Sequence, residues 1–154
     1  MDRAVSVEDI YAAASRRVGA SAGYAGDITL QEAWSLLKDD ADAFLVDVRT
    51  EAEWSYVGTP DLSPIGRKPI FAQWLLAPAM SENPNFFDDL AAQGMTPGKA
   101  AIVMCRTVNR SLKAARAMTA KGFPRSYFML EGFEGSLDGE KHRGLRDGWK
   151  LLRR

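Results

Sequence analysis

Cysteine and histidine are nearly absent from this chain of 154 residues, which contains one of each, Cys105 and His142. A single cysteine excludes an internal disulfide, a metal cluster built on several thiolates, and a second thiol that could resolve an intermediate formed on the first. A Cys-His hydrolase would need its one histidine as the base, and we expect His142 to be structural or exposed. We therefore expect neither a metal nor an organic cofactor.

Long hydrophobic runs and net charge are missing as well. No window approaches about 18 consecutive apolar residues, and charged side chains occupy positions 2, 3, 8 and 9, so we expect no membrane span and no signal peptide. The 20 basic side chains balance 20 acidic ones, and 46% of the residues are hydrophobic. This composition is typical of an ordinary globular protein of one domain, which we place in the cytoplasm.

Acidic residues are missing between Leu90 and Leu130, where seven basic ones occur: Lys99, Arg106, Arg110, Lys113, Arg116, Lys121 and Arg125. The region around Cys105 is therefore predicted to be positive. The basic side chains either form the solvated face of a helix or attract a small anion or an acidic partner. Nucleic acid is disfavoured, because no aromatic residues are interleaved with these basic ones and the overall charge is neutral.

Helical and strand patterns alternate along the chain. Helices are expected at residues 5–18, 30–39, 50–54, 85–93 and 111–121, and strands at residues 44–48, 70–76, 100–104 and 126–130. Capping boxes, Thr29 with Glu32 and Thr50 with Glu53, predict two of the helix starts. The alternation implies parallel strands in a sheet covered on both faces. We expect a helical leader and a flexible connection at residues 1–26 and an α/β domain at residues 27–154.

The cysteine lies where the strand at residues 100–104 ends, which is the edge where α/β sheets bind ligands. The loop from Cys105 to Arg110 has six residues. Its backbone N–H groups, the start of the next helix and two arginines would stabilise a thiolate and an anion attached to it. Ser111 is expected to cap that helix, and Arg110 to reach the anion with a fork of donors. The pattern predicts a reactive thiol.

Three stretches resemble the rhodanese family of single-domain sulfurtransferases, and the resemblance extends from about residue 28 to residue 149. They are LVDVRTEAEW at residues 45–54, IVMCRTVNRS at residues 102–111 and LEGFEGSLDGEKHRGLRDGWK at residues 130–150. The resemblance implies a rhodanese-like α/β fold, with a five-stranded parallel sheet and helices on both faces. It also implies an enzyme that moves sulfane sulfur from an anionic donor, thiosulfate-like or a persulfide, to a thiol or cyanide acceptor.

Carried over to this chain, the family motif makes Cys105 the nucleophile and persulfide carrier. The donor would be bound by the side chains and loop amides of Arg106, Thr107, Val108, Asn109, Arg110 and Ser111. Asp47 and Arg49 match the family's DVR motif, and we expect them to order loops near the site rather than to react. Trp74 and Phe133 are candidates to face the site.

The partners implied are a small anionic sulfur donor and a thiol or protein that accepts the sulfur. The glycine-rich residues 132–148 are a candidate either to cover the site or to form a homodimer. The sequence leaves both arrangements open.

Two departures from the family pattern leave alternatives open. Val108 stands where the family often has glycine, and a β-branched residue at positive φ costs about 1 to 2 kcal/mol or more. Either Asn109 takes the left-handed turn or the anion cradle differs. Gly58 is followed by Thr59 rather than by histidine, and residues 60–74 look like an insertion. A catalytically weak module that binds a protein partner or senses an anion is therefore an alternative.

A cysteine phosphatase or an arsenate reductase is a further alternative, because these enzymes also combine a thiolate with loop amides and an arginine. Their loops resemble Cys-x5-Arg, whereas four residues separate Cys105 from Arg110, which leaves less room for a tetrahedral oxyanion. A phosphatase also needs a general acid, for which Glu134 or Asp138 could be proposed. Sulfur transfer has no such requirement.

Overall fold

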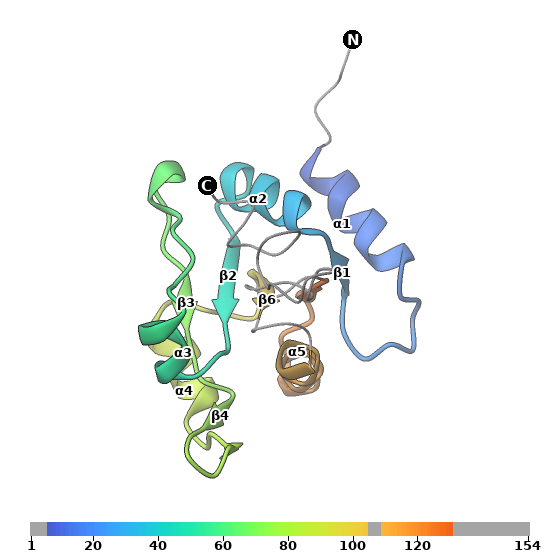
Figure 1. Ribbon diagram of the computed structural model, residues 1–154. Coiled ribbons are helices and arrows are strands. Elements are labelled where there is room, and N and C mark those ends of the chain that lie inside the picture. The colour runs from blue at the N-terminus through green and yellow to red at the C-terminus, as the bar shows by residue number, and fades with distance from the viewer. Residues whose placement is uncertain (1–5, 105–108, 131–154) are drawn as a thin grey trace, which may run out of the picture.

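The computed structural model describes residues 6–104 and 109–130 (Figure 1). Its elements follow the order α1 (Val7–Arg16), β1 (Gly26–Ile28), α2 (Leu30–Asp39), β2 (Ala43–Asp47), α3 (Glu51–Tyr56), a 3₁₀ turn (Ser63–Ile65), β3 (Ile70–Phe71), β4 (Leu75–Leu76), β5 (Ser81–Glu82), α4 (Phe86–Ala92), β6 (Ala100–Met104), α5 (Asn109–Lys121) and β7 (Ser126–Met129). Every helix within these ranges is too short or too polar to span a bilayer.

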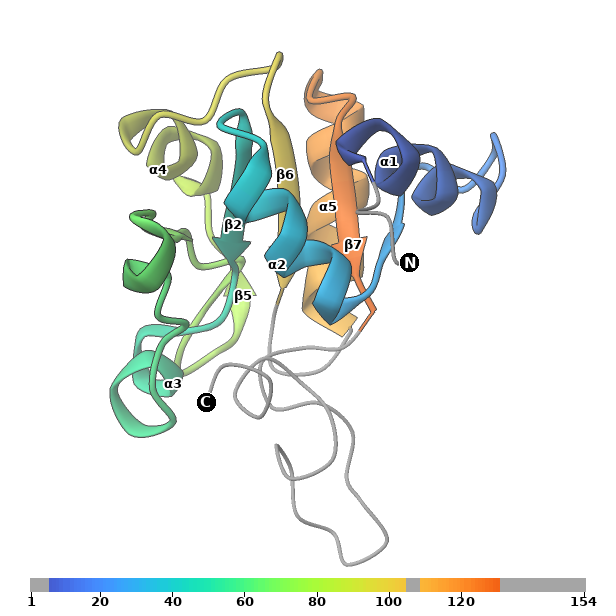
Figure 2. The ribbon, with the colours of Figure 1, turned by 90° about the horizontal axis from the view of Figure 1, so that it is seen from above.

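Five parallel strands form one sheet in the order β1-β7-β6-β2-β3, with β6 at its centre. The helices α1 and α2 cover one face, whereas α4 and α5 cover the other (Figures 1 and 2). The predicted five-stranded parallel sheet with helices on both faces is thus confirmed.

Two hydrophobic clusters fill the spaces between the sheet and its helices. Successive side chains of a strand point to opposite faces, so Leu45 and Ile102 join the cluster under α1 and α2. Val46 and Val103 join the cluster under α4 and α5. Because both faces of β2 and β6 are buried, these strands are continuous apolar runs rather than alternating ones, which is the pattern expected of a central parallel strand.

Strand β1 was not predicted from the sequence, and it begins at Gly26, the last residue of the predicted connection. Gly26 pairs with Tyr127 of β7, and α1 packs closely against β1 from outside. A Cβ atom on Gly26 would lie 2.5 Å from the backbone carbonyl carbon of Ala14, which only glycine avoids. Helix α1 shares the main core through Ile10. The domain boundary between residues 26 and 27 stays a prediction.

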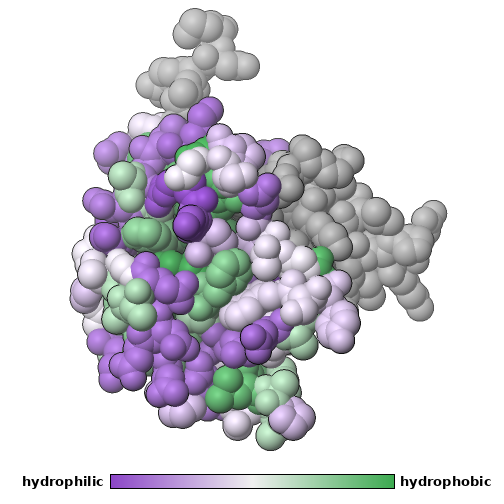
Figure 3. Space-filling model, turned by 90° about the vertical axis from the view of Figure 1, so that its left-hand side faces the viewer, coloured by the Kyte–Doolittle hydropathy of each residue, from purple (hydrophilic) through white to green (hydrophobic). Residues whose placement is uncertain are grey.

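The predicted strand at residues 70–76 is divided between two sheets. Residues of β3 pair with β2, whereas β4 turns away and forms an antiparallel hairpin with β5. Beyond β3 the chain still follows β2, because the Trp74 N–H donates to the Val48 carbonyl at 3.2 Å. Asn83 connects this segment to the hairpin, since its side-chain amide donates to the Gln73 carbonyl at 2.9 Å and its backbone N–H donates to the Trp74 carbonyl at 2.9 Å. The face that carries α3 and the hairpin mixes hydrophilic and hydrophobic residues, and hydrophobic ones are visible both in its middle and at its lower end (Figure 3).

Both predicted capping boxes are present. Thr29 caps α2 with Glu32, and Thr50 caps α3 with Glu53. Helix α5, by contrast, begins at Asn109, two residues before the predicted start. Ser111 is therefore the third residue of the helix and completely buried, so the expectation that it caps the helix is wrong.

Candidate active site

Strands β2 and β6 end side by side at the carboxyl edge of the sheet. Asp47, the last residue of β2, is in register with Met104, the last residue of β6, and Cys105 follows Met104 directly in the chain. One residue further along, the Val48 N–H donates to the Met104 carbonyl at 2.9 Å. The DVR segment is therefore hydrogen-bonded to the residue that immediately precedes the only cysteine.

Asp47 and Arg49 form an ion pair whose side chains are both 0% exposed. The Arg49 guanidinium donates from Nε to Asp47 Oδ1 at 2.9 Å and from Nη2 to Oδ2 at 2.7 Å. Nη2 also donates at 2.8 Å to the carbonyl of Gly58, which lies just after α3. A buried ion pair is tolerable only when such hydrogen bonds satisfy it. The arrangement supports the expectation that this pair orders loops near the site, which stays a prediction.

A second ion pair joins α3 to the start of α5. Arg110 Nη1 donates to Glu53 Oε1 at 2.5 Å, and Nη2 donates to Oε2 at 2.8 Å. The two side chains are only 17% and 19% exposed. The paired geometry is the bidentate one that guanidinium and carboxylate groups form best. The capping-box pattern predicts a role for Glu53 only at the start of α3, and no local signal indicates its contact with Arg110, 57 positions away.

The capping box holds the Glu53 carboxylate in place for that contact. Its Oε1 accepts hydrogen bonds from the Thr50 N–H at 3.0 Å and from Thr50 Oγ1 at 3.1 Å. Partial burial raises the pKa of Glu53, but the hydrogen bonds from Arg110 and Thr50 outweigh it and lower the pKa to about 2. Glu53 is therefore ionised at neutral pH and cannot serve as a proton donor.

The structure places the other predicted site residues as follows. Asn109 is the first residue of α5 and Ser111 lies buried within its first turn. Cys105, Arg106, Thr107 and Val108 lie outside the described residues, as do Phe133, His142 and the glycine-rich residues 132–148.

Trp74 is buried and packs edge-on against Phe86 of α4, with ring centroids 5.1 Å apart. It belongs to the hydrophobic cluster beneath α4 and α5. The structure thus gives Trp74 a place in the core.

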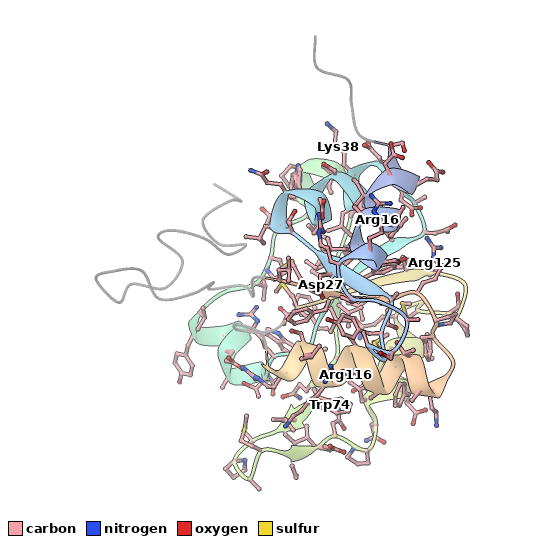
Figure 4. The ribbon with its side chains drawn as sticks, turned by 90° about the vertical axis from the view of Figure 1, so that its right-hand side faces the viewer. Arg16, Asp27, Lys38, Trp74, Arg116 and Arg125 are labelled. Carbon is pink, nitrogen blue, oxygen red and sulfur yellow. The ribbon has the colours of Figure 1, made fainter. Side chains whose placement is uncertain are left out.

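The predicted positive region is more dispersed than the sequence suggests. Lys99 lies over Phe44, Lys121 over Phe87 and Arg125 over Tyr11, at 5.0 to 5.3 Å from the ring centroids. Lys99 immediately precedes β6, Lys121 is the last residue of α5, and Arg125 immediately precedes β7. All three therefore lie at the amino edge of the sheet. Arg125 is accordingly on the side of the molecule opposite α3 (Figure 4). A parallel crossover reverses direction through its helix, which carries these charges away from Cys105.

Comparisons with known proteins match this architecture. The family model described as a rhodanese-like domain matches residues 29–137. The crystal structure of Rv0390 from M. tuberculosis is 44% identical, with a TM-score of 0.74, and the match covers 84% of this chain and 94% of that one. The polysulfide-sulfur transferase homodimer from Wolinella succinogenes shares the fold, at 24% identity and a TM-score of 0.55, over 88% of this chain and 90% of that one.

A curated relative of similar length supports the same assignment. The uncharacterized protein RC0915 of Rickettsia conorii is 34% identical over 125 residues, which is 80% of this chain and 90% of that protein. The family model alone spans more than two thirds of the chain, and it includes β2, α3, β6 and α5, the elements that form the candidate site. The chain therefore belongs to the family of proteins with a rhodanese-like domain.

Proposed function

We propose that this protein is a sulfurtransferase that carries sulfane sulfur as a persulfide on Cys105. The observation that carries the proposal is the position of the cysteine, which directly follows Met104 at the carboxyl end of the central strand of a rhodanese-like sheet. That edge is where open α/β sheets bind their ligands. The chain has no other thiol that could take this role.

Helix α5 supports the proposal through its polarity. It has 13 residues and begins four positions after Cys105 in the sequence. The first turn of a helix presents backbone N–H groups without intrahelical partners and about half a positive charge. Both features favour the thiolate form of a nearby cysteine over its neutral thiol, and both favour the binding of an anionic donor.

The two ion pairs support the proposal through rigidity. Asp47 and Arg49 order the segment whose Val48 N–H donates to the Met104 carbonyl, and Glu53 connects α3 to Arg110 near the start of α5. The chain segments on either side of residues 105–108 are thus both connected to the segment after β2. Such support reduces the cost of holding a reactive group in one geometry.

Sulfur would move in two displacements at sulfur. The Cys105 thiolate attacks the outer sulfur of thiosulfate, an S–S bond forms to Cys105, and the original S–S bond breaks with its electron pair leaving on sulfite. The persulfide anion on Cys105 is then attacked at its outer sulfur by cyanide or an acceptor thiolate. This releases thiocyanate or a new persulfide and restores the Cys105 thiolate. Neither step requires a metal or an external reductant.

The proposal includes the partners and the location expected from the sequence: a small anionic donor, a thiol or protein acceptor, and the cytoplasm. Mass spectrometry of the intact protein after incubation with thiosulfate or glutathione persulfide tests its chemistry. We expect a mass gain of one sulfur atom that cyanide removes as thiocyanate. Cys105→Ser is expected to abolish both signals while keeping the circular dichroism spectrum. A folded wild-type protein that gains no sulfur from either donor would instead favour the catalytically weak module.

A further inference from the structure

The described arginines that flank the candidate site are already paired with carboxylates. Arg49 is matched by Asp47, and both terminal nitrogens of Arg110 donate to Glu53. The pairs bring two positive and two negative charges to this part of the sheet edge, so together they add no net charge. Both terminal nitrogens of Arg110, which was expected to bind the anionic end of a donor, contact Glu53, and binding of the donor by Arg110 stays a prediction.

The strength of the Glu53 contact argues that a donor does not simply replace it. Glu53 is fixed at the third position of α3 by the Thr50 capping box, and its pKa of about 2 shows that it stays charged throughout the neutral range. Displacing it from Arg110 would leave a carboxylate that is 19% exposed without its counter-charge. Such a partly buried and unpaired charge is costly.

Resting on the proposed function, we infer that Glu53 is a specificity-determining residue, which neutralises Arg110 and so favours donors that bring one negative charge to Cys105 over the dianion thiosulfate. Organic persulfides, R–S–S⁻, are the donor class with one charge at the reacting end. The Cys105 thiolate would attack their outer sulfur, and the S–S bond would break with its electron pair leaving on the thiolate R–S⁻.

The physical reason is the dependence of binding on charge product. Attraction between ions scales with the product of their charges, and it is strengthened where water is partly excluded. The attraction between an unpaired guanidinium and a dianion is about twice its attraction to a monoanion at the same distance, so such a site would favour the dianion. A carboxylate held against the guanidinium cancels most of that preference, leaving donors to be selected by their shape and leaving group.

The chain offers a matched control for the test. Glu32 occupies the same capping-box position in α2 and pairs with Arg17 in the same bidentate way, at 2.7 and 2.8 Å. This pair connects the end of α1 to the start of α2, on the face of the sheet opposite α5 (Figure 1). Glu32→Gln therefore removes one charge from an equivalent local structure without changing the charge beside Arg110.

The experiment measures kcat/KM for thiosulfate and for 2-hydroxyethyl persulfide, an organic persulfide whose only charge is on its outer sulfur, with the wild-type protein, Glu53→Gln and Glu32→Gln. We expect Glu53→Gln to raise the ratio of thiosulfate to persulfide efficiency about tenfold, a change that corresponds to about 1.4 kcal/mol. Glu32→Gln is expected to leave the ratio unchanged. A loss of rate that is equal for both donors would show a merely structural role for Glu53 and overturn the inference.

A second measurement covers the case in which Glu53→Gln does not fold. Thiosulfate transfer by the wild-type protein is followed as ionic strength rises, because salt weakens attraction between a charged site and a dianion. A shallow dependence, similar to that for the persulfide donor, supports a neutralised site, whereas a steep fall for thiosulfate alone overturns it. Absence of transfer from both donors, with no persulfide on Cys105, would remove the proposed function itself rather than the donor preference.

Discussion

Asp47 and Arg49 form an ion pair that has no exposed side-chain surface, and the second residue of the pair also donates to the carbonyl of Gly58 beyond α3. Because the two residues are only two positions apart in sequence, their side-chain hydrogen bonds span the turn that follows β2. Val48, the residue between them, donates its N–H to the Met104 carbonyl. The pair therefore stabilises both the turn and its connection to the central strand.

Replacing Asp47 with asparagine should destabilise the protein strongly. The variant leaves the buried Arg49 guanidinium without its counter-charge, and breaking a buried pair in this way costs about 3 to 5 kcal/mol. Urea denaturation followed by circular dichroism measures the change. Glu32→Gln is the comparison, because the exposed Glu32–Arg17 pair is worth less than about 1 kcal/mol. Equal losses in the two variants would contradict the importance assigned to burial.

Arg110→Ala should destabilise the protein by an amount that depends on pH. The folded-state pKa of Glu53 is about 2, below its ordinary value of 4.5, so the ion pair stabilises the fold fully above pH 4.5. That stabilisation is lost as pH falls from about 4.5 toward 2. We expect a loss of about 1 to 3 kcal/mol at pH 7, after allowing for partial exposure, and a smaller difference from wild type at pH 3.5.

Denaturation of both proteins at several pH values provides the measurement for Arg110→Ala. A difference between them that stays constant from pH 7 to pH 3.5 would contradict the sign derived from Glu53. Sulfur transfer by the same variant is assayed well below its melting temperature, where the variant is still folded. We expect its rate to fall by more than the loss of folded protein explains, because Arg110 lies near the start of α5 beside the proposed cysteine site.

Gly26→Ala should weaken the contact between α1 and β1. The added methyl group would lie within 2.5 to 2.8 Å of backbone atoms of Ala14 and Ser15, which cannot yield as a flexible side chain would. We expect a loss of about 1 to 3 kcal/mol, as for other overpacked sites. Gly98→Ala is the control, because no atom lies within 4 Å of a Cβ there. An unchanged melting temperature for Gly26→Ala would contradict the described packing.

The Cys105 thiol should titrate below about pH 7 if the loop amides and the start of α5 stabilise its anion, compared with about 8.5 for an ordinary cysteine. The rate of alkylation by iodoacetamide as a function of pH reports this value, and the single cysteine makes the signal unambiguous. Alkylation with a midpoint near 8.5 would remove the electrostatic basis of the proposal. Addition of sulfite, the product released from thiosulfate in the first step, should slow the reaction.

Local patterns predicted much of the fold correctly. The capping boxes that begin at Thr29 and Thr50 depend on residues three positions apart, and both are present. The strand at Ala100–Met104 agrees with its apolar run, since it is buried on both faces. Three motif stretches indicate the family, and the family model over residues 29–137 confirms it.

Short or divided elements were beyond local patterns. Strand β1 has three residues, Gly26–Ile28, with a charged one in the middle, so it lacks the apolar run that marks a strand. It forms because β7 offers an open edge and α1 covers it. The segment after Phe71 has strand-like residues throughout, yet β4 pairs with β5 rather than with β2, a contact that local pattern does not reveal.

By itself the sequence determined the alternating elements, the two helix caps, the family, and the position of the lone cysteine after a buried strand, because each of these depends on residues that are close in the chain. The tertiary structure alone decided which charges meet. Glu53 and Arg110 are 57 positions apart, and Lys99, Lys121 and Arg125 lie at the edge of the sheet opposite the one near Arg110. Electrostatic attraction and hydrogen bonding depend on distance in space, which only the packing of α3 against the start of α5 sets.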